Sequence, residues 1–208
     1  MKSQKDFWDA RHKKGAFEHF SKEASSFANE FAKIMPPSSR ILELGCGVGV
    51  DSNYFASLGH TVIATDFSQS AIVKNVDYYH EKGLSFELLD LEEKFPYKDS
   101  SFDAVYARLS LHYFPDKKTR EIFREILRVL KQDGLLGFVV KSVKDPNFGS
   151  GEELGENLFE KDGHVRHFFT EEYAKDVLES FEIVKIESRD EEFSGETSSF
   201  INVLARKK

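Results

Sequence analysis

The sequence is poor in the features that mark secreted and membrane proteins. Its 208 residues include one cysteine, Cys46, so no disulfide can form within the chain. The longest strongly apolar run, residues 135–140, is far too short to cross a bilayer. Residues 1–10 carry two lysines but lack the apolar segment of a secretory signal. These absences favour a reducing compartment without membrane attachment, and we expect a cytoplasmic location.

The sequence also lacks an excess of positive charge. It has 29 Lys and Arg against 36 Asp and Glu, which gives a formal net charge of -7. Proteins that bind nucleic acids usually carry a basic face, so we expect no nucleic-acid partner. Apolar residues make up 40% and charged residues 31%, as in ordinary globular domains, and the length is enough for one sizeable core.

A stretch from residue 40 to residue 66 organises the rest of the sequence. It begins with the apolar run ILEL, which predicts a buried strand, and continues with a turn that contains Gly45, Gly47 and Gly49. Residues 50–58 have a helical pattern, and residues 61–65 predict a second strand that leads to Asp66. Strand, glycine turn, helix, strand and acid are typical of the nucleotide-binding half of a doubly wound sheet.

Each conspicuous residue of this stretch has a physical reason. Gly45 can adopt the backbone angles of a sharp turn between strand and helix. A side chain at Gly47 would keep a ligand away from the backbone, and Gly49 would let the helix lie close to the strand. Asp66 is expected at the carboxyl end of its strand, where a carboxylate can accept hydrogen bonds from both hydroxyls of a ribose. The stretch therefore predicts a nucleoside site.

The remaining sequence continues the alternation of strands and helices. We expect strands at residues 41–44, 61–65, 84–89, 102–107, 135–140, 181–187 and 199–205. We expect helices at residues 16–35, 50–58, 68–82, 115–130 and 170–180. This pattern predicts an α/β fold with a doubly wound, mostly parallel seven-stranded sheet, helices on both faces and an antiparallel last strand.

Two segments lie outside this alternation. We expect one domain over residues 1–208, with a helical cap at residues 1–37 and an active-site insertion at residues 142–168. Apolar residues recur at helical spacing between residues 20 and 31, which favours a helix that packs one face on the domain. Residues 142–168 are glycine-rich and charged, and we expect them to be irregular.

The glycine spacing resembles motif I of the class I S-adenosylmethionine-dependent methyltransferases. That motif commonly reads E/D-x-G-x-G-x-G, and residues 43–49 match it at every fixed position, whereas dinucleotide sites prefer G-x-G-x-x-G. Residues 40–141 also resemble the core of this family in the order of their elements. The resemblance implies S-adenosyl-L-methionine as cofactor and S-adenosyl-L-homocysteine as product. It also raises the alternative that the N-terminal helix, with Phe7, Trp8 and Phe17, is a lid over the cofactor.

The resemblance implies which residues bind the nucleoside. Asp66 matches the residue that holds the ribose, and Phe67 matches a residue that often packs on the adenine ring. Asp90, with the backbone of Leu91, matches the pair that reads adenine. An acceptor at Asp90 suits the adenine amino group, although an aspartate here could also cap a turn.

The resemblance also implies how the methionine part is held. Glu43 matches an acidic residue that helps to orient the amino group, and Arg108 matches a position whose backbone often meets the same group. Gly45 and Gly47 belong to the matched motif and would form the turn around the cofactor. No metal is expected.

More narrowly, the size of the chain and its last residues, 200–208, are similar to the tellurite-resistance methyltransferases. This likeness implies a small-molecule acceptor without identifying it. Methyl transfer from a sulfonium is an in-line displacement, so positioning and desolvation supply most of the acceleration. A base is needed only when the acceptor holds its proton tightly.

Several side chains are candidates for the acceptor side. His112 and Tyr113 follow the fourth strand and could serve as a base or an orienting group, or could simply pack. Arg166 could grip an anionic acceptor. Alternation would place His164 and Arg166 on one face of their segment and His167 on the other. A metal site from the two histidines is not favoured, because no carboxylates stand at a recognisable spacing.

Two other functions stay open at this point. A nicotinamide-dependent oxidoreductase would fit the glycine turn, and Tyr-x-x-x-Lys occurs at Tyr78 and at Tyr113, but the first is too early for a short-chain dehydrogenase. A protein that binds the cofactor without catalysis is the second alternative. The sequence after the fourth strand lacks the motif of enzymes that methylate amino groups of DNA bases. The oligomeric state is not predicted.

Overall fold

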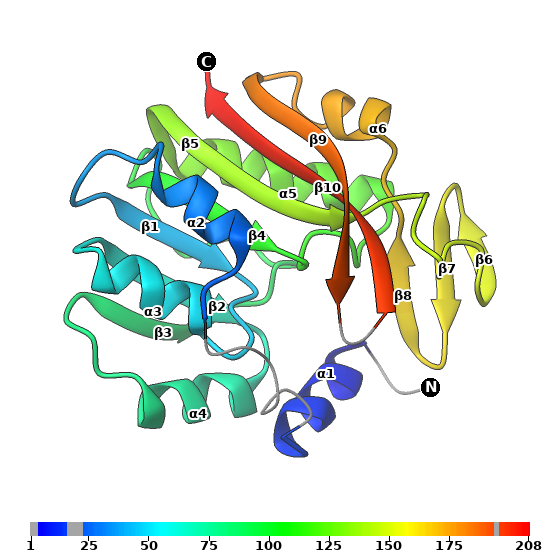
Figure 1. Cartoon of the computed structure of the whole chain (residues 1–208), viewed down its shortest axis with the longest axis horizontal. Coiled ribbons are helices and arrows are strands. Elements are labelled where there is room, and N and C mark those ends of the chain that lie inside the picture. Colours follow the sequence, from blue (N-terminus) through cyan, green and yellow to red (C-terminus); the bar gives the residue numbers. More distant parts are fainter. Residues whose placement is uncertain (1–3, 16–22, 194–195) are drawn as a thin grey trace.

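A seven-stranded sheet forms the centre of the computed structural model, which describes residues 4–15, 23–193 and 196–208 (Figure 1). Its order is β3-β2-β1-β4-β5-β10-β9. Its strands are β1 (Arg40–Leu44), β2 (Thr61–Asp66), β3 (Leu84–Leu88), β4 (Phe102–Arg108), β5 (Leu130–Lys141), β9 (Phe181–Phe193) and β10 (Glu196–Lys207). β1 to β5 are parallel, and β10 is antiparallel to both of its neighbours. The predicted fold class is confirmed, including the antiparallel last strand.

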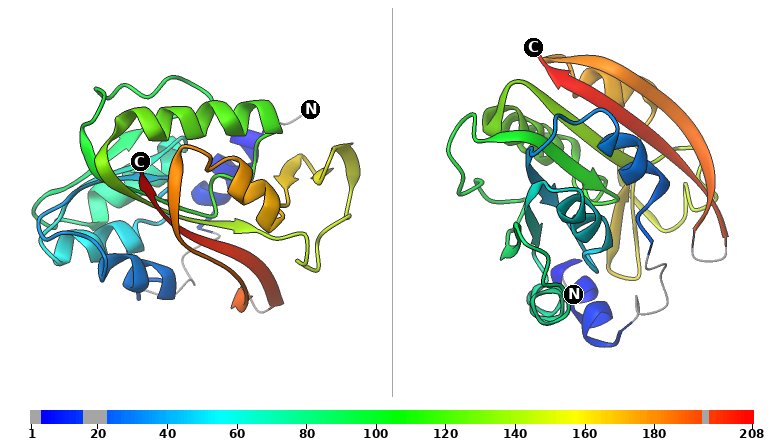
Figure 2. Two further views of the ribbon diagram at one scale, coloured as in Figure 1. Left: turned by 90° about the horizontal axis from the view of Figure 1, so that it is seen from above. Right: turned by 60° about the vertical axis from the view of Figure 1, so that its left-hand side comes forward.

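Helices cover both faces of this sheet (Figure 2). They are α2 (Ser26–Ala32), α3 (Val50–Ser57), α4 (Gln69–Tyr78), α5 (Asp116–Val129) and α6 (Glu171–Asp176), and a further helix, α1 (Gln4–Lys13), lies at an edge of the sheet. One apolar cluster packs α5 and α6 on one face through side chains such as Ile122, Ile126 and Ala174. A second cluster packs α2, α3 and α4 on the other face through Phe31 and Phe55 among others. Among the described residues, no helix has the length and apolar character to span a membrane.

The order of the strands reverses between β1 and β4, which lie side by side. In a doubly wound sheet the connections that leave two such strands go to opposite faces, and a crevice opens at their carboxyl ends. The glycine turn follows β1 and residues 109–114 follow β4. The topology therefore brings the predicted cofactor residues and the predicted acceptor residues to one edge.

The segment between β5 and α6 is more regular than expected. Residues 142–168 contain a three-stranded antiparallel sheet of β6 (Glu152–Gly155), β7 (Leu158–Lys161) and β8 (His164–His167). It lies beside the main sheet, at the right of Figure 1. Asp162 and Gly163, with φ of 56° and 79°, form the turn between β7 and β8, and Asp-Gly is a typical hairpin turn. The prediction of an irregular segment was wrong because strands of four residues give little periodicity.

The N-terminal region also differs from the prediction. The helix expected over residues 16–35 is α2, which begins after Ser25, whose hydroxyl accepts the N–H of Ala28 at 3.0 Å. Residues 16–22, with Phe17 and Phe20, lie outside the described residues. An additional helix, α1, contains Phe7 and Trp8.

α4 ends at Tyr78 rather than near Lys82, and its apolar residue Val76 is 51% exposed. A buried position is taken by the polar Asn75, because its amide donates to the carbonyl of Gly47 at 2.9 Å. A polar residue is therefore buried on this helix because the glycine turn requires a hydrogen-bond donor.

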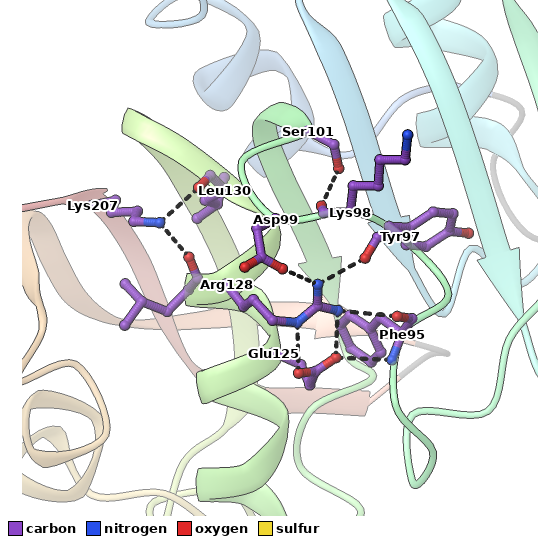
Figure 3. Close-up of polar contacts among 10 residues, drawn as sticks. Phe95, Tyr97, Lys98, Asp99, Ser101, Glu125, Arg128, Leu130 and Lys207 are labelled. Atoms are coloured by element: carbon purple, nitrogen blue, oxygen red, sulfur yellow. Dashed lines mark hydrogen bonds and ion pairs between the residues drawn. The ribbon is translucent and has the colours of Figure 1, made fainter.

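The charged connection between β3 and β4 is fixed by Arg128 of α5 (Figure 3). The guanidinium donates to the carbonyls of Phe95 and Tyr97 at 3.0 and 2.7 Å. It also donates to the carboxylates of Glu125 and Asp99 at 2.7 to 2.8 Å, so all five of its N–H groups have acceptors. Arg128 therefore holds the chain as it crosses from the site edge back to the start of β4.

Candidate functional site

The glycine turn follows β1 directly. Gly45 has a φ of +75°, and its N–H and that of Cys46 each donate to the carbonyl of Thr65 at 2.8 Å. A Cβ atom on Gly45 would lie 2.5 Å from the Cβ of Ser110, which follows β4. Ser110 is fixed there because its hydroxyl donates to the carbonyl of Leu44 at 2.6 Å. Only glycine satisfies both this close approach and this backbone angle.

The next two glycines have different surroundings. Gly47 (φ +54°) faces open space, and the nearest atom to a Cβ built there is Cε1 of His12 at 4.0 Å. The backbone therefore has room for a ligand at this point. Gly49 makes room for two rings, one of them from β3: a Cβ there would lie 3.0 Å from Tyr79 and 3.1 Å from Phe86.

Asp66 lies at the end of β2 and is only 7% exposed. Its two carboxylate oxygens accept the N–H of Gly47 at 3.0 Å and the N–H of Ser68 at 2.9 Å. Burial raises the pKa of Asp66, while the Ser68 bond and the nearby His12 oppose this shift. Each carboxylate oxygen has a second lone pair, so a ribose diol can still bind.

Glu43 is a buried carboxyl group inside β1, 3% exposed. Burial raises its pKa to about 8, and the negative charges of Asp51 and Asp66 act in the same direction. The hydroxyl of Ser52 donates to Glu43, and the charge of Arg108 favours its ionised form; both oppose the shift. Near neutral pH the group is therefore largely protonated, and an ammonium group bound beside it would favour its ionisation.

Asp90 follows β3 at the same edge. One of its oxygens accepts the N–H of Glu92 at 3.0 Å, and the other pairs with Lys5 of α1. Leu91 is buried and Phe67 is half-buried. The structure thus places Asp90 and Phe67 at the ends of neighbouring strands, but a side chain of α1 occupies one acceptor of Asp90.

α1 lies across this edge, between α4 and β8 (Figure 1). One of its faces carries Lys5, Asp9 and His12 at helical spacing. Asp9 accepts the hydroxyl of Ser68 at 2.9 Å and the N–H of Ser70 at 3.2 Å. His12 is buried near Asp66. These contacts attach α1 to the start of α4 and cover the predicted nucleoside position.

Phe7 and Trp8 of α1 meet the acceptor candidates. The ring of Phe7 stacks on His164 with centroids 4.7 Å apart, and Trp8 lies 5.4 Å from Tyr113. Tyr113 in turn lies 5.2 Å from His164 and 4.3 Å from the ring of His112. Side chains from α1, from β8 and from the segment after β4 therefore form one cluster.

His112 and Tyr113 are both neutral near pH 7. Burial and the charge of Arg166 lower the pKa of His112 well below its ordinary value. Burial raises the pKa of Tyr113 to about 12, while Arg166 and Arg11 oppose the shift. His112 is therefore a weak base, and its role would be to accept or donate a hydrogen bond.

The two histidines of β8 point in opposite directions, as the alternation predicted. His167 packs against Tyr173 with centroids 4.7 Å apart, and its Nδ1 lies 3.2 Å from the carbonyl of Phe114. His164 instead packs on Phe7. Within the described ranges, no three side chains of the metal-binding types gather closely enough to hold an ion.

A partly buried hydrogen-bond network around Asp51, whose charge acts on Glu43, was not predicted from the sequence. Asp51 of α3 accepts hydrogen bonds from the N–H and hydroxyl of Ser25, each at 2.8 Å, and from the hydroxyl of Tyr106, also at 2.8 Å. Ser25 precedes α2 and Tyr106 lies in β4, so the bonds join three distant segments. Cys46 is buried, and burial raises the pKa of its thiol, which favours the neutral form.

Known proteins match this fold and turn. Residues 41–134 match the family model described as a methyltransferase domain. The uncharacterized methyltransferase YcgJ of Bacillus subtilis is 32% identical over 97 residues, which are 46% of this chain and 38% of that protein. The chain thus matches well under half the length of this curated relative.

Solved structures agree over more of the chain. A SAM-dependent methyltransferase from Methanosarcina mazei has a TM-score of 0.75 at 22% identity, with 89% of this chain and 98% of that chain covered. TehB from Haemophilus influenzae has a TM-score of 0.71 at 19% identity, with 96% and 66% covered. At these identities the structures show the fold alone.

Proposed function

We propose that this chain, which belongs to the class I S-adenosylmethionine-dependent methyltransferases, transfers a methyl group to a small-molecule acceptor. The observation that carries the proposal is the pairing of an open glycine turn at Gly47 with the buried carboxylate of Asp66, 3.0 Å from its N–H. Both lie at the switch point between β1 and β4, where doubly wound sheets bind their ligands. The cytoplasmic location stays a prediction.

The residues of the edge fit the cofactor. Asp66 would accept the ribose hydroxyls through its remaining lone pairs, and Asp90 would accept the adenine amino group after Lys5 is displaced. Phe67 and Leu91 would flank the base. Gly45 and Gly47 would form the turn beside the cofactor, and Glu43 and Arg108 would orient its amino group. When bound, the cofactor supplies an electrophilic methyl group on a sulfonium.

The residues of the chain would then position the acceptor and exclude water. α1 and β8 cover the edge from two sides, and this arrangement supports a helical cap at residues 1–37 and an insertion at residues 142–168 that closes the active site. His112 and Tyr113 would orient the acceptor as neutral hydrogen-bonding groups, because neither ionises near pH 7. Exclusion of water and an in-line approach supply most of the acceleration in such displacements.

Calorimetric titration with S-adenosyl-L-homocysteine tests the proposal. We expect a dissociation constant on the order of micromolar, and at least about tenfold weaker binding for Asp66→Asn, because a ribose diol loses a charged acceptor. Asp77→Asn is the matched control, since Asp77 is exposed on the same connection, in α4. Equal binding by Asp66→Asn, or binding of NAD in preference, would contradict the proposal. Binding without methyl transfer to any acceptor would favour the non-catalytic alternative.

A further inference from the structure

The aromatic cluster beside the predicted cofactor site is only partly covered. It consists of Phe7 and Trp8 of α1, Tyr113 after β4, and His164 of β8, and Trp8 lies 5.1 Å from His164. His164 is 8% exposed, whereas Trp8 and Tyr113 are half-buried. The cluster therefore presents flat apolar surface that a ligand can reach.

Three buried nitrogen atoms around this cluster lack partners among the described residues: Nδ1 of His112, Nε2 of His164 and Nε of Arg166. His112 is 1% exposed. Native proteins rarely leave buried polar atoms unsatisfied, because each such atom costs free energy. Three of them at one place, on side chains from two segments, indicate a position for a polar ligand group.

The charge at this place is positive. Arg11 of α1 lies over the rings of Phe7 and Trp8, 5.5 and 5.9 Å from their centroids. Burial lowers the pKa of His164 to about 3, and the positive charges of Arg166 on β8 and of Arg11 act in the same direction. The same two charges oppose the rise that burial causes in the pKa of Tyr113.

Other charges face the same cluster. The negative charge of Asp66 also raises the pKa of Tyr113, but its effect is smaller than those of burial and of the two arginines. Lys141 also acts on His112, but it donates to the carboxylate of Asp145 at 2.6 Å, which offsets its charge. The two arginines therefore make the electrostatic potential at the cluster positive, although the whole chain has a net charge of -7.

The cluster lies next to the cofactor edge. Trp8 contacts Tyr113, and His12, four residues later on α1, is the side chain nearest to open Gly47. Four residues of helix span about 6 Å. This separation between Trp8 and His12 would place an acceptor on the cluster beside the methyl group of the cofactor, not at a separate site.

We infer that the methyl acceptor is an anion with a flat unsaturated body, that Arg166 and Arg11 bind its negative charge, and that Trp8, Tyr113 and His164 pack on its body. This inference rests on the proposed function. Guanidinium groups suit planar anions because they bind them in a bidentate manner, and aromatic side chains stack on unsaturated ligands.

The step balances without a base. A lone pair on the anionic atom of the acceptor attacks the methyl carbon, and the carbon–sulfur bond breaks with its electron pair on sulfur. The negative acceptor and the positive sulfonium become two neutral groups, and no proton is released. A neutral His112 therefore suffices.

Trp8 is the one tryptophan of the chain, so its fluorescence reports binding to the cluster. The probes are benzoate, phenylacetate and indole-3-carboxylate, each compared with its carboxamide, in the presence of saturating S-adenosyl-L-homocysteine. We expect the carboxylates to quench the fluorescence of Trp8 and to bind at least about tenfold more tightly than the amides. A tenfold difference in affinity corresponds to the lower end of the free energy of a hydrogen bond to a charged group. Arg166→Met should remove this preference, Arg166→Lys should keep part of it, and Arg11→Met should reduce it.

Arg124→Met, an exposed substitution on α5, is the control and should leave the preference unchanged. Thermal midpoints of all variants establish that they fold. Equal binding of carboxylates and amides, failure of every carboxylate to bind, or an unchanged preference in both Arg166→Met and Arg11→Met overturns the inference. Calorimetry of S-adenosyl-L-homocysteine on the same samples separates the two ideas: if it binds while the preference is missing, only the acceptor inference fails, and if it does not bind, the proposed function fails.

Discussion

The buried carboxyl group of Glu43 links the stability of the protein to pH. Its pKa is about 8 in the folded chain against 4.5 for the ordinary group. Because the folded state holds the proton more tightly, the stability of the fold is greatest below the lower value and falls as the pH rises toward 8. Each pKa unit corresponds to 1.36 kcal/mol, so the difference between 8 and 4.5 sets an upper bound on the stability that is lost. Above pH 8 the free energy of unfolding is lower by at most about 5 kcal/mol than at low pH.

Glu43→Gln removes the ionisation and keeps an acceptor for the hydroxyl of Ser52. We expect the ligand-free variant to match the parent near about pH 5 and to exceed it by at least about 1 kcal/mol near about pH 9. Its melting temperature at the higher pH should then rise by about 2 to 4 °C. Urea unfolding and thermal melts at both pH values measure this, with the exposed Glu179→Gln as the control.

The same substitution should impair binding of the cofactor product. If Glu43 binds the ammonium group as a carboxylate, its proton must leave on binding, so the affinity of the parent for S-adenosyl-L-homocysteine should rise by about tenfold per pH unit below the pKa and level off above it. Glu43→Gln should bind weakly at every pH and without this slope. A stability difference that is equal at both pH values, or a variant that retains the slope, would refute the reasoning.

Three further changes give separate tests. Lys5→Ala should free Asp90 and tighten binding of S-adenosyl-L-homocysteine by up to about fivefold in calorimetry, because an exposed ion pair is worth at most about 1 kcal/mol; unchanged or weaker binding argues against adenine at Asp90. Gly45→Ala should destabilise the fold by about 2 to 4 kcal/mol in urea, since its Cβ would collide with Ser110, and a loss below about 0.5 kcal/mol would be inconsistent with the turn. Arg128→Met should cost about 2 kcal/mol in the same assay, because two backbone carbonyls lose their donor, and unaltered stability would show that the connection is held otherwise.

Local features of the site could be read from the sequence because they depend on neighbours in the chain. The turn angle of Gly45, the position of Asp66 at the end of β2 and the opposite faces of His164 and His167 follow from strand and turn geometry alone. The hairpin at Asp162 and Gly163 also had a local signal, which the glycine-rich composition of the segment obscured.

Other features join residues that are far apart, and no local pattern encodes them. Lys5 and Asp90 are separated by 85 residues, and the contact depends on how α1 docks. The close approach of Ser110 to Gly45 depends on the pairing of β1 with β4. Asn75 is a polar residue at a buried position of α4, because its amide donates to a carbonyl of the glycine turn.

A crystal structure of the protein with S-adenosyl-L-homocysteine tests the central claim most directly. We expect the ligand at the edge of β1, β2 and β3, with its ribose hydroxyls on Asp66, its adenine amino group on Asp90, and Lys5 displaced from that carboxylate. A ligand bound elsewhere, or an edge that keeps the side chains of α1 in place at saturating ligand, would contradict it.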